Sequence, residues 1–180
     1  ADFGLSLYHT WFDDFIYLAA TGEEEDDLPV FEYRQQGAKH YGIEAEASFP
    51  LFRGEGFTVI GDVQGDSVRA TLDDGTAVPR IPPLSLLGAL ELQSDRFDLR
   101  GEVQWFDAQD RLAPLETATD GFTQVNLSLA WKVLRGSDNA TVILQANNVF
   151  DAEGRRHASF TKDFVPLAGR NVKLSLRTSF

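Results

Sequence analysis

The side chains best suited to chemistry in this sequence are carboxylates and a few histidines. The densest group of charges is an acidic run, which consists of Glu23, Glu24, Glu25, Asp26 and Asp27. Carboxylates bind hard cations, and beside an imidazole such as His40, at the far end of the same polar segment, they can bind zinc. The run therefore has two interpretations, a loop that captures cations or a solvated loop kept soluble by its like charges.

The motifs of common enzymes are not present. No two of the three histidines (His9, His40 and His157) have the H-x-x-x-H spacing, and neither G-x-S-x-G nor G-x-x-x-x-G-K-S/T occurs. The chain has no cysteine, which excludes thiolate nucleophiles, thiolate metal sites and disulfides. Glu44 and Glu46 face one side of a segment and are interpreted as surface lining rather than as a paired acid and base. We predict no enzymatic activity and no cofactor.

Length and composition narrow the class of protein further. The chain has 180 residues, enough for a single domain over 1–180, and its net charge of −12 disfavours nucleic acid as a partner. Hydrophobic residues make up 43%, which is too many for a disordered chain. No run of about 18 apolar residues could form a membrane helix. A strand of a membrane barrel, however, needs only about 9–11 alternating residues.

The elements that must position these side chains alternate with a period of two. Five segments alternate clearly, at 41–49, 84–93, 97–106, 124–133 and 171–180. Weaker alternation covers the start of the chain to Leu18, residues 57–68 and residues 140–148. Because successive side chains on a strand point to opposite faces, the pattern predicts about eight two-faced strands and no helix.

The connections between these segments alternate in length. Three are short and have turn compositions, at 53–56, 94–95 and 135–138, whereas the long polar ones cover 20–38, 69–82, 108–120 and 150–170. In an up-and-down meander, all short turns then lie on one rim and all long loops on the other. Bacterial outer-membrane barrels have this layout.

The two faces of the strands also favour a barrel over a soluble sheet with one buried face. Strands of about 10–12 residues exceed the soluble mode of about 5–6. Aromatic residues near the strand ends match interfacial girdles: Trp11, Tyr17, Tyr41, Phe49, Phe57, Phe97, Trp105, Trp131 and Phe180. The opposite face is charged and suits a wet lumen: Glu44, Glu46, Asp62, Asp66, Glu91, Asp98, Arg100, Glu102, Lys132, Lys173 and Arg177. We predict an all-β fold of antiparallel, up-and-down transmembrane β-barrel strands.

Two motifs near the C-terminus resemble TonB-dependent outer-membrane receptors. Residues 145–151 (QANNVFD) are similar to the strand that precedes the last extracellular loop of that family. Residues 169–180 (GRNVKLSLRTSF) resemble its last strand, with a Gly-Arg start and a terminal aromatic residue. Upstream, residues 13–18 (DDFIYL) and 42–46 (GIEAE) resemble another recurrent pair of strands.

The resemblance implies a location in the bacterial outer membrane and a role in TonB-dependent uptake of a metal ion or metal chelate. Such receptors have a barrel of about 22 strands with a plug inside it, so this chain would be the C-terminal third of one. The implied partners are membrane lipid, the remaining barrel strands, the plug, TonB acting through the plug, and the metal ion or metal chelate that the receptor binds. One alternative is a small eight-stranded barrel that closes on itself and serves in anchoring or adhesion. Another is a soluble β-sandwich binding module.

A narrower resemblance lies in the last long connection. Residues 156–163 (RHASFTKD), with Pro166 and the Gly-Arg pair, look like the zinc-uptake branch of these receptors. This resemblance implies that His157, with Asp163, contributes to a path for metal, since imidazole is a suitable zinc ligand. The competing interpretation is an ordinary polar loop held down by Phe160 and Phe164.

Overall fold

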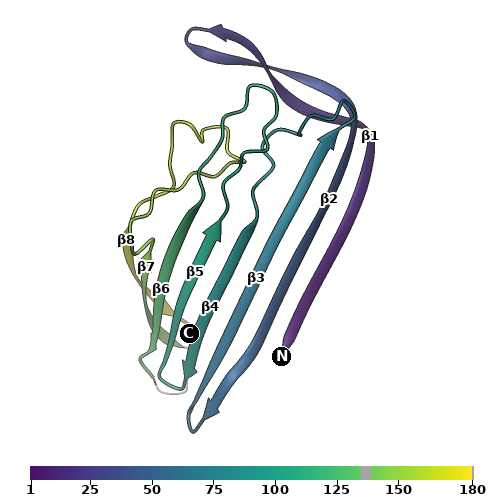
Figure 1. Ribbon diagram of the computed structural model, residues 1–180. Coiled ribbons are helices and arrows are strands. Elements are labelled where there is room, and N and C mark those ends of the chain that lie inside the picture. The colour runs from purple at the N-terminus through teal and green to yellow at the C-terminus, as the bar shows by residue number, and fades with distance from the viewer. Residues whose placement is uncertain (135–138, 180) are drawn as a thin grey trace.

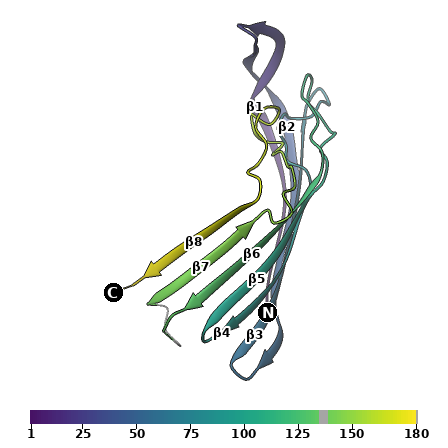
Figure 2. The ribbon, with the colours of Figure 1, turned by 90° about the vertical axis from the view of Figure 1, so that its left-hand side faces the viewer.

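One antiparallel sheet accounts for all the regular structure in residues 1–134 and 139–179, which the computed structural model describes. Each strand pairs with its neighbours in the chain, and the strands lie side by side in a curved sheet (Figures 1 and 2). The strands are β1 Asp2–Glu25, β2 Leu28–Gly54, β3 Phe57–Leu72, β4 Ser85–Ser94, β5 Phe97–Phe106, β6 Phe122–Lys132, β7 Ala140–Asn147 and β8 Asn171–Thr178. The predicted all-β, up-and-down order is confirmed.

The connections segregate onto two rims as predicted. Short turns join β2 to β3 and β4 to β5 at one end, and the long loops 73–84, 107–121 and 148–170 lie at the other (Figure 1). The predicted turn at 135–138 and the terminal Phe180 lie outside the described residues. In the described part of the chain, no helix has the length and hydropathy to cross a membrane.

The expected long loop at 20–38 is wrong. These residues instead continue β1 and β2 beyond the body of the sheet, as a two-stranded ribbon that bends over the long loops (Figure 1). The pairing of β2 with β3 begins only at Ala38 opposite Leu72, so residues 13–37, which we call the hairpin extension, have no third strand beside them. The surroundings of the two faces of the extension differ from those of the sheet below it. Its polar sequence therefore shows no alternation.

The turn of the extension explains how an acidic run can close a hairpin. Asp26 and Asp27 form a two-residue loop between Glu25 and Leu28, with φ angles of 51° and 62°. A hairpin loop in which both residues are left-handed matches the right-handed twist of the strands, and aspartate tolerates that conformation better than most residues. Two register shifts, between Phe12 and Phe15 and between Ala20 and Glu24, bend the ribbon.

The apolar face of the sheet is exposed along its length. The register places Leu99 beside Leu129, and Leu144 beside Leu174, on one face. Leu127 is 46% exposed and Leu174 is 71% exposed. A soluble sandwich would bury these side chains between sheets, and no second sheet exists in the described residues. The face has the character of a surface that contacts lipid.

The opposite face carries the predicted charges and pairs several of them. Arg100 on β5 forms ion pairs with Asp62 on β3, with Glu91 on β4 at 3.3 Å and with Glu102 at 3.4 Å. Lys132 on β6 lies 3.1 Å from Asp98. These pairs cross the strands and keep the charges of the polar face compensated where they are only partly solvated.

The sheet does not close on itself within the described residues. No contacts join β1 to β8, so each of these strands has one unpaired edge. The predicted alternative, a small barrel closed by its own eight strands, is therefore wrong for this structure. Its dry core is correspondingly small: Ala38, Ala70, Leu72 and Val78 pack with Phe15, Tyr17 and Ile81 where the hairpin extension leaves the sheet.

A charge on the apolar face tests its contact with lipid. Leu127→Arg should destabilise the full-length protein in lipid vesicles by about 2–4 kcal/mol, because an arginine near the bilayer midplane loses its hydration. The matched control is Gln104→Arg, on the polar face between Leu87 and Gln124. Denaturant titration in vesicles measures both, and equal losses of stability would contradict the assignment of the faces.

Candidate functional site

The long-loop rim is a built surface, since its connections bind one another. The backbone N–H of Asp73 donates to the carbonyl of Gly37 at 2.9 Å, which ties loop 73–84 to the hairpin extension. The Gln109 amide donates to the carbonyl of Ile81 at 2.9 Å. Arg111 donates to the carbonyl of Ala70 at 2.8 Å, so loop 107–121 is also anchored to β3.

A buried ion cluster fastens loop 107–121 to loop 148–170. It consists of Glu116, His157 and Lys162, whose side chains are 8%, 1% and 6% exposed. The Nε2 of His157 lies 3.1 Å from Oε1 of Glu116, and the Nζ of Lys162 lies 3.6 Å from the same oxygen. The His157 contact is within ion-pair distance, although Nε2 of His157 has no hydrogen-bond partner among the described residues.

The polar groups around the cluster satisfy most of its hydrogen-bonding capacity. Lys162 donates to the carbonyl of Thr117 at 2.6 Å, and Nδ1 of His157 lies 3.0 Å from the hydroxyl of Thr119. Two backbone N–H groups donate to the Glu116 carboxylate, from Arg80 at 2.8 Å and from Ala113 at 2.9 Å. Because Arg80 belongs to loop 73–84, Glu116 connects all three long loops.

The surroundings of Glu116 decide its ionisation. Burial by itself would raise the pKa of this carboxyl group. The contact with His157 and the two backbone N–H donors outweigh burial, and the pKa falls to about 2. Glu116 is therefore a carboxylate at neutral pH, with a counter-charge supplied by Lys162.

These contacts describe a structural role for His157, and its predicted contact with metal stays a prediction. The Lys162 ammonium lies 3.3 Å from Nδ1 of His157, where its positive charge opposes a cation. Asp163, the other predicted ligand in this loop, is exposed and accepts a hydrogen bond from the Thr117 hydroxyl at 2.7 Å. Among the described residues, no three His, Asp or Glu side chains are grouped so that they could hold a metal ion.

His40 lies far from the acidic run, contrary to the expectation that both belong to one loop. It is part of the sheet, opposite Thr10 on β1 and Ala70 on β3. Its ring packs against Phe12 and Phe15, with centroid distances of 5.1 and 4.9 Å. The separation follows from the unexpected strands, because the ladder of β1 and β2 puts the length of the hairpin extension between His40 and the acidic tip.

The acidic run occupies the tip of the hairpin extension. Glu23, Glu24 and Glu25 end β1, and Asp26 and Asp27 form the turn. All five are exposed, and none has an ion-pair partner within the part of the chain that the structure describes. The run is thus held away from the sheet on its long-loop side, and cation capture by it stays a prediction.

The QANNVFD motif has a structural function in loop 148–170. Asn148, 2% exposed and left-handed at φ 49°, exchanges hydrogen bonds of 2.8 Å with the backbone of Ala152 and donates to the carbonyl of Ala168 at 3.3 Å. Asp151 accepts from the backbone N–H of Arg170 at 2.7 Å. One asparagine thus joins both ends of a loop of more than twenty residues just above β7 and β8.

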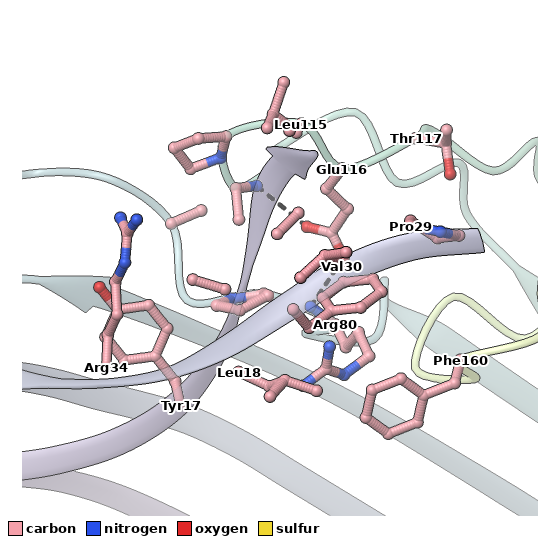
Figure 3. Close-up of a pocket in the computed structure, with 18 of the residues that line it drawn as sticks. Tyr17, Leu18, Pro29, Val30, Arg34, Arg80, Leu115, Glu116, Thr117 and Phe160 are labelled. Atoms are coloured by element: carbon pink, nitrogen blue, oxygen red, sulfur yellow. Dashed lines mark hydrogen bonds between the residues drawn. The ribbon is translucent and has the colours of Figure 1, made fainter. Parts of the chain in front are cut away.

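A pocket of about 360 Å³ opens between the hairpin extension and the three long loops (Figure 3). Leu18, Val30 and Leu115 supply apolar walls, and Arg80 places its guanidinium carbon 4.0 Å from the centroid of the Phe160 ring. Such a stack of a guanidinium on an aromatic ring contributes about 0.5–2 kcal/mol. The walls of this pocket on the rim are thus amphipathic.

Sequence reasoning missed Arg80 and Glu116, and it assigned Phe160 only to packing. Each is an isolated residue in an irregular loop, and the three come from three different connections. Tyr17, predicted to lie in an aromatic girdle, instead accepts a hydrogen bond from Gln36 at 2.9 Å within the hairpin extension. In the sequence, the one residue that pointed to this site was His157. No rule of residue spacing could predict its buried partners.

Removing the carboxylate of the ion cluster should release the loops. Glu116→Gln leaves Lys162 buried without its counter-charge, a loss on the order of 3 kcal/mol for a buried pair. We expect amide hydrogen exchange in loops 107–121 and 148–170 to accelerate roughly a hundredfold, as that energy implies. Glu153→Gln, which removes the 71% exposed partner of Arg155, serves as the control and should leave exchange unchanged.

Acid should release the same loops in the native chain. Because folding lowers the pKa of Glu116 from 4.5 to about 2, its contribution to stability is complete above pH 4.5 and is lost as pH falls towards 2. Hydrogen exchange in loop 107–121 should accelerate over that window. The Glu116→Gln variant should show no such step, and a step of equal size in it would assign the acid response to another group.

The comparisons with known proteins agree with this geometry. Residues 1–149 match the family described as TonB dependent receptor-like, beta-barrel. Among solved structures, the chain is similar to the copper transporter OprC, with a TM-score of 0.81 and 21% identity over 98% of this chain. It is also similar to a structure of the FpvAI–pyocin S2 complex, with a TM-score of 0.63 and 18% identity over 97% of this chain.

A third similar structure is the FrpB iron transporter from Neisseria meningitidis (F3-3 variant), with a TM-score of 0.62 and 20% identity over 97% of this chain. At these identities the likeness is one of fold. The chain spans only about a quarter of these proteins, namely 28% of OprC, 24% of the FpvAI complex chain and 28% of FrpB. Because the family matches residues 1–149 and the strands form an up-and-down sheet, the chain belongs to the β-barrel family of TonB-dependent receptors, which reside in the bacterial outer membrane.

Proposed function

We propose that this chain is part of a receptor that takes up a metal ion or metal chelate through the outer membrane, driven by TonB. The observation that carries the proposal is the two-faced sheet of a TonB-dependent receptor family, with exposed leucines on one side and a charged face on the other. Two of the similar structures, described as a copper transporter and an iron transporter, favour metal as the cargo class.

The proposed partners follow from what the sheet leaves unsatisfied. The free edges of β1 and β8 expose backbone hydrogen-bonding groups, and each unsatisfied group in lipid costs several kcal/mol. We therefore propose that the remaining barrel strands pair with both edges and that a plug fills the space beside the polar face. TonB acts through that plug, so the energy for transport comes from outside this chain, and the chain is a conduit rather than an enzyme.

The proposal that zinc is the cargo is based on the resemblance of residues 156–163 to the zinc-uptake branch. The acidic tip of the hairpin extension supports a bare cation, because it offers five exposed carboxylates on the side where cargo arrives. His157 and Asp163 are the proposed contacts deeper in the rim. The copper and iron transporters among the similar structures make these two metals the direct competitors of zinc.

Transport assays with the full-length receptor distinguish these cargoes. Cells that carry it as their receptor for a scarce metal should accumulate radiolabelled zinc, copper or iron, and uptake should stop when the TonB gene is deleted. For bare zinc, neutralising the tip (Glu23, Glu24 and Glu25 to Gln; Asp26 and Asp27 to Asn) should lower the apparent affinity several-fold by removing carboxylate attraction.

The control neutralises an acidic residue elsewhere. Glu55→Gln, in the short turn on the opposite rim, should leave the affinity for zinc unchanged. Unchanged uptake in both the tip variant and His157→Ala would remove zinc capture by these residues. Uptake that persists without TonB would remove the proposed function itself.

A further inference from the structure

We infer that the pocket between the hairpin extension and the long loops binds a small amphipathic anion, whose negative group pairs with Arg80 and whose apolar body lies between the hairpin and loop 107–121. The inference rests on the proposed function only in that the rim of a receptor meets dissolved molecules. The binding itself requires neither metal nor transport.

The basic residues of the pocket wall favour an anion. Three basic residues line the pocket, and two are already paired: Arg34 with Glu32 at 2.5 Å and Lys162 with Glu116 at 3.6 Å. Arg80 has no carboxylate within ion-pair distance among residues 1–134 and 139–179. Its guanidinium therefore keeps its hydrogen-bond donors available.

The Arg80 cation is also partly removed from water. Burial lowers the pKa of Arg80, although the charge of Glu116 raises it. The Glu116 carboxylate cannot serve as its partner, because it is engaged by two backbone N–H groups, His157 and Lys162. An anion that enters the pocket would restore to the guanidinium the charge-assisted hydrogen bonds that it lacks.

The backbone also holds Arg80 in this place at a conformational cost. Arg80 and Leu115 both line the pocket in the left-handed conformation, with φ angles of 61° and 64°. Non-glycine residues in that region are strained, by about 1–3 kcal/mol each, and they persist where the surroundings fix them. The bond from the backbone N–H of Arg80 to Glu116 fixes the first, and the ring of Phe160 then orients its guanidinium.

The chemistry of the remaining walls sets the class of ligand. Leu18, Val30 and Leu115 offer contact to an aromatic or branched body, and a pocket of about 360 Å³ accommodates one of modest size. Planar guanidinium groups recognise carboxylates and related oxyanions in a bidentate manner. Four further carboxylates, Glu23, Glu24, Asp74 and Asp163, also line the pocket, but all four side chains are exposed, so water and salt screen their repulsion.

Three probes with the same naphthalene ring test the inference on the full-length receptor in lipid nanodiscs. They are naphthoate, naphthalenemethanol and naphthylmethylammonium, whose attached groups are anionic, neutral and cationic. Naphthoate should bind about tenfold more tightly than the neutral alcohol, the difference expected for one charge-assisted bond. The cationic probe should bind most weakly.

The variant Arg80→Asn removes the guanidinium, and asparagine tolerates the left-handed backbone. It should lower the affinity for naphthoate about tenfold and leave that for naphthalenemethanol unchanged. Arg53→Met, an exposed arginine on the opposite rim, should affect neither probe. Hydrogen exchange in loop 107–121 reports whether each variant keeps its fold.

Equal affinities for the three probes, or naphthoate binding unaffected by Arg80→Asn, would overturn the inference. Metal uptake is measured independently of probe binding. A receptor that binds naphthoate through Arg80 but transports no metal would refute the proposed function alone. One that transports metal but shows no preference for the anion would refute the pocket alone.

Discussion

Lipid offers no hydrogen bonds, and this one constraint shapes the chain from β1 to β8. Every backbone N–H and C=O in the hydrocarbon layer must find a partner in a neighbouring strand, and a ladder of such bonds joins each of the eight strands of the described sheet to its neighbours in the chain. Because the ladder satisfies the backbone, the side chains of one face are free to be wholly apolar, such as Leu127 and Leu174. The other face can then carry charges, which Arg100 and Lys132 compensate across strands.

Where the chain leaves that ladder, side chains must replace strand neighbours as hydrogen-bond partners. Asn148 does so for loop 148–170, by bonding to the backbone of Ala152 and Ala168. Glu116 does so for Arg80 and Ala113, and its ion pair with Lys162 ties the loops together. These two residues turn long connections into a surface fixed enough to hold a pocket. A rim without them would have to pay the conformational entropy of ordering each loop when a ligand binds.

The difference between ladder and loop also explains how far the sequence could be interpreted. Lipid on one side of the sheet and water on the other impose alternation on the sequence. The segments 97–106 and 124–133 therefore predicted their strands, faces and approximate ends. The strands of the hairpin extension were not predicted, because no lipid layer makes one of its faces apolar and the other polar. In addition, its two-residue turn of aspartates resembled a solvated loop. The cluster of Glu116, His157 and Lys162 was not predicted because Glu116 and His157 lie on different loops, 41 positions apart, with β6 and β7 between them. No periodicity relates residues that meet only through tertiary packing.

The hairpin extension and the ion cluster together give the rim its asymmetry. The extension carries five carboxylates at its tip, which are exposed to solvent and form no ion pair within the described residues. Glu116, in contrast, is a buried carboxylate that already has His157, Lys162 and two backbone N–H groups as partners. Arg80, whose guanidinium stacks on the ring of Phe160, lines the same pocket. It is the basic residue of the pocket that has no carboxylate within ion-pair distance among the described residues. A molecule in the pocket therefore meets the Arg80 guanidinium, apolar walls and the carboxylates of the hairpin together. Because repulsion by those carboxylates, although screened, grows with the charge of the ligand, the pocket favours a compact apolar body with a single anionic group over highly charged anions.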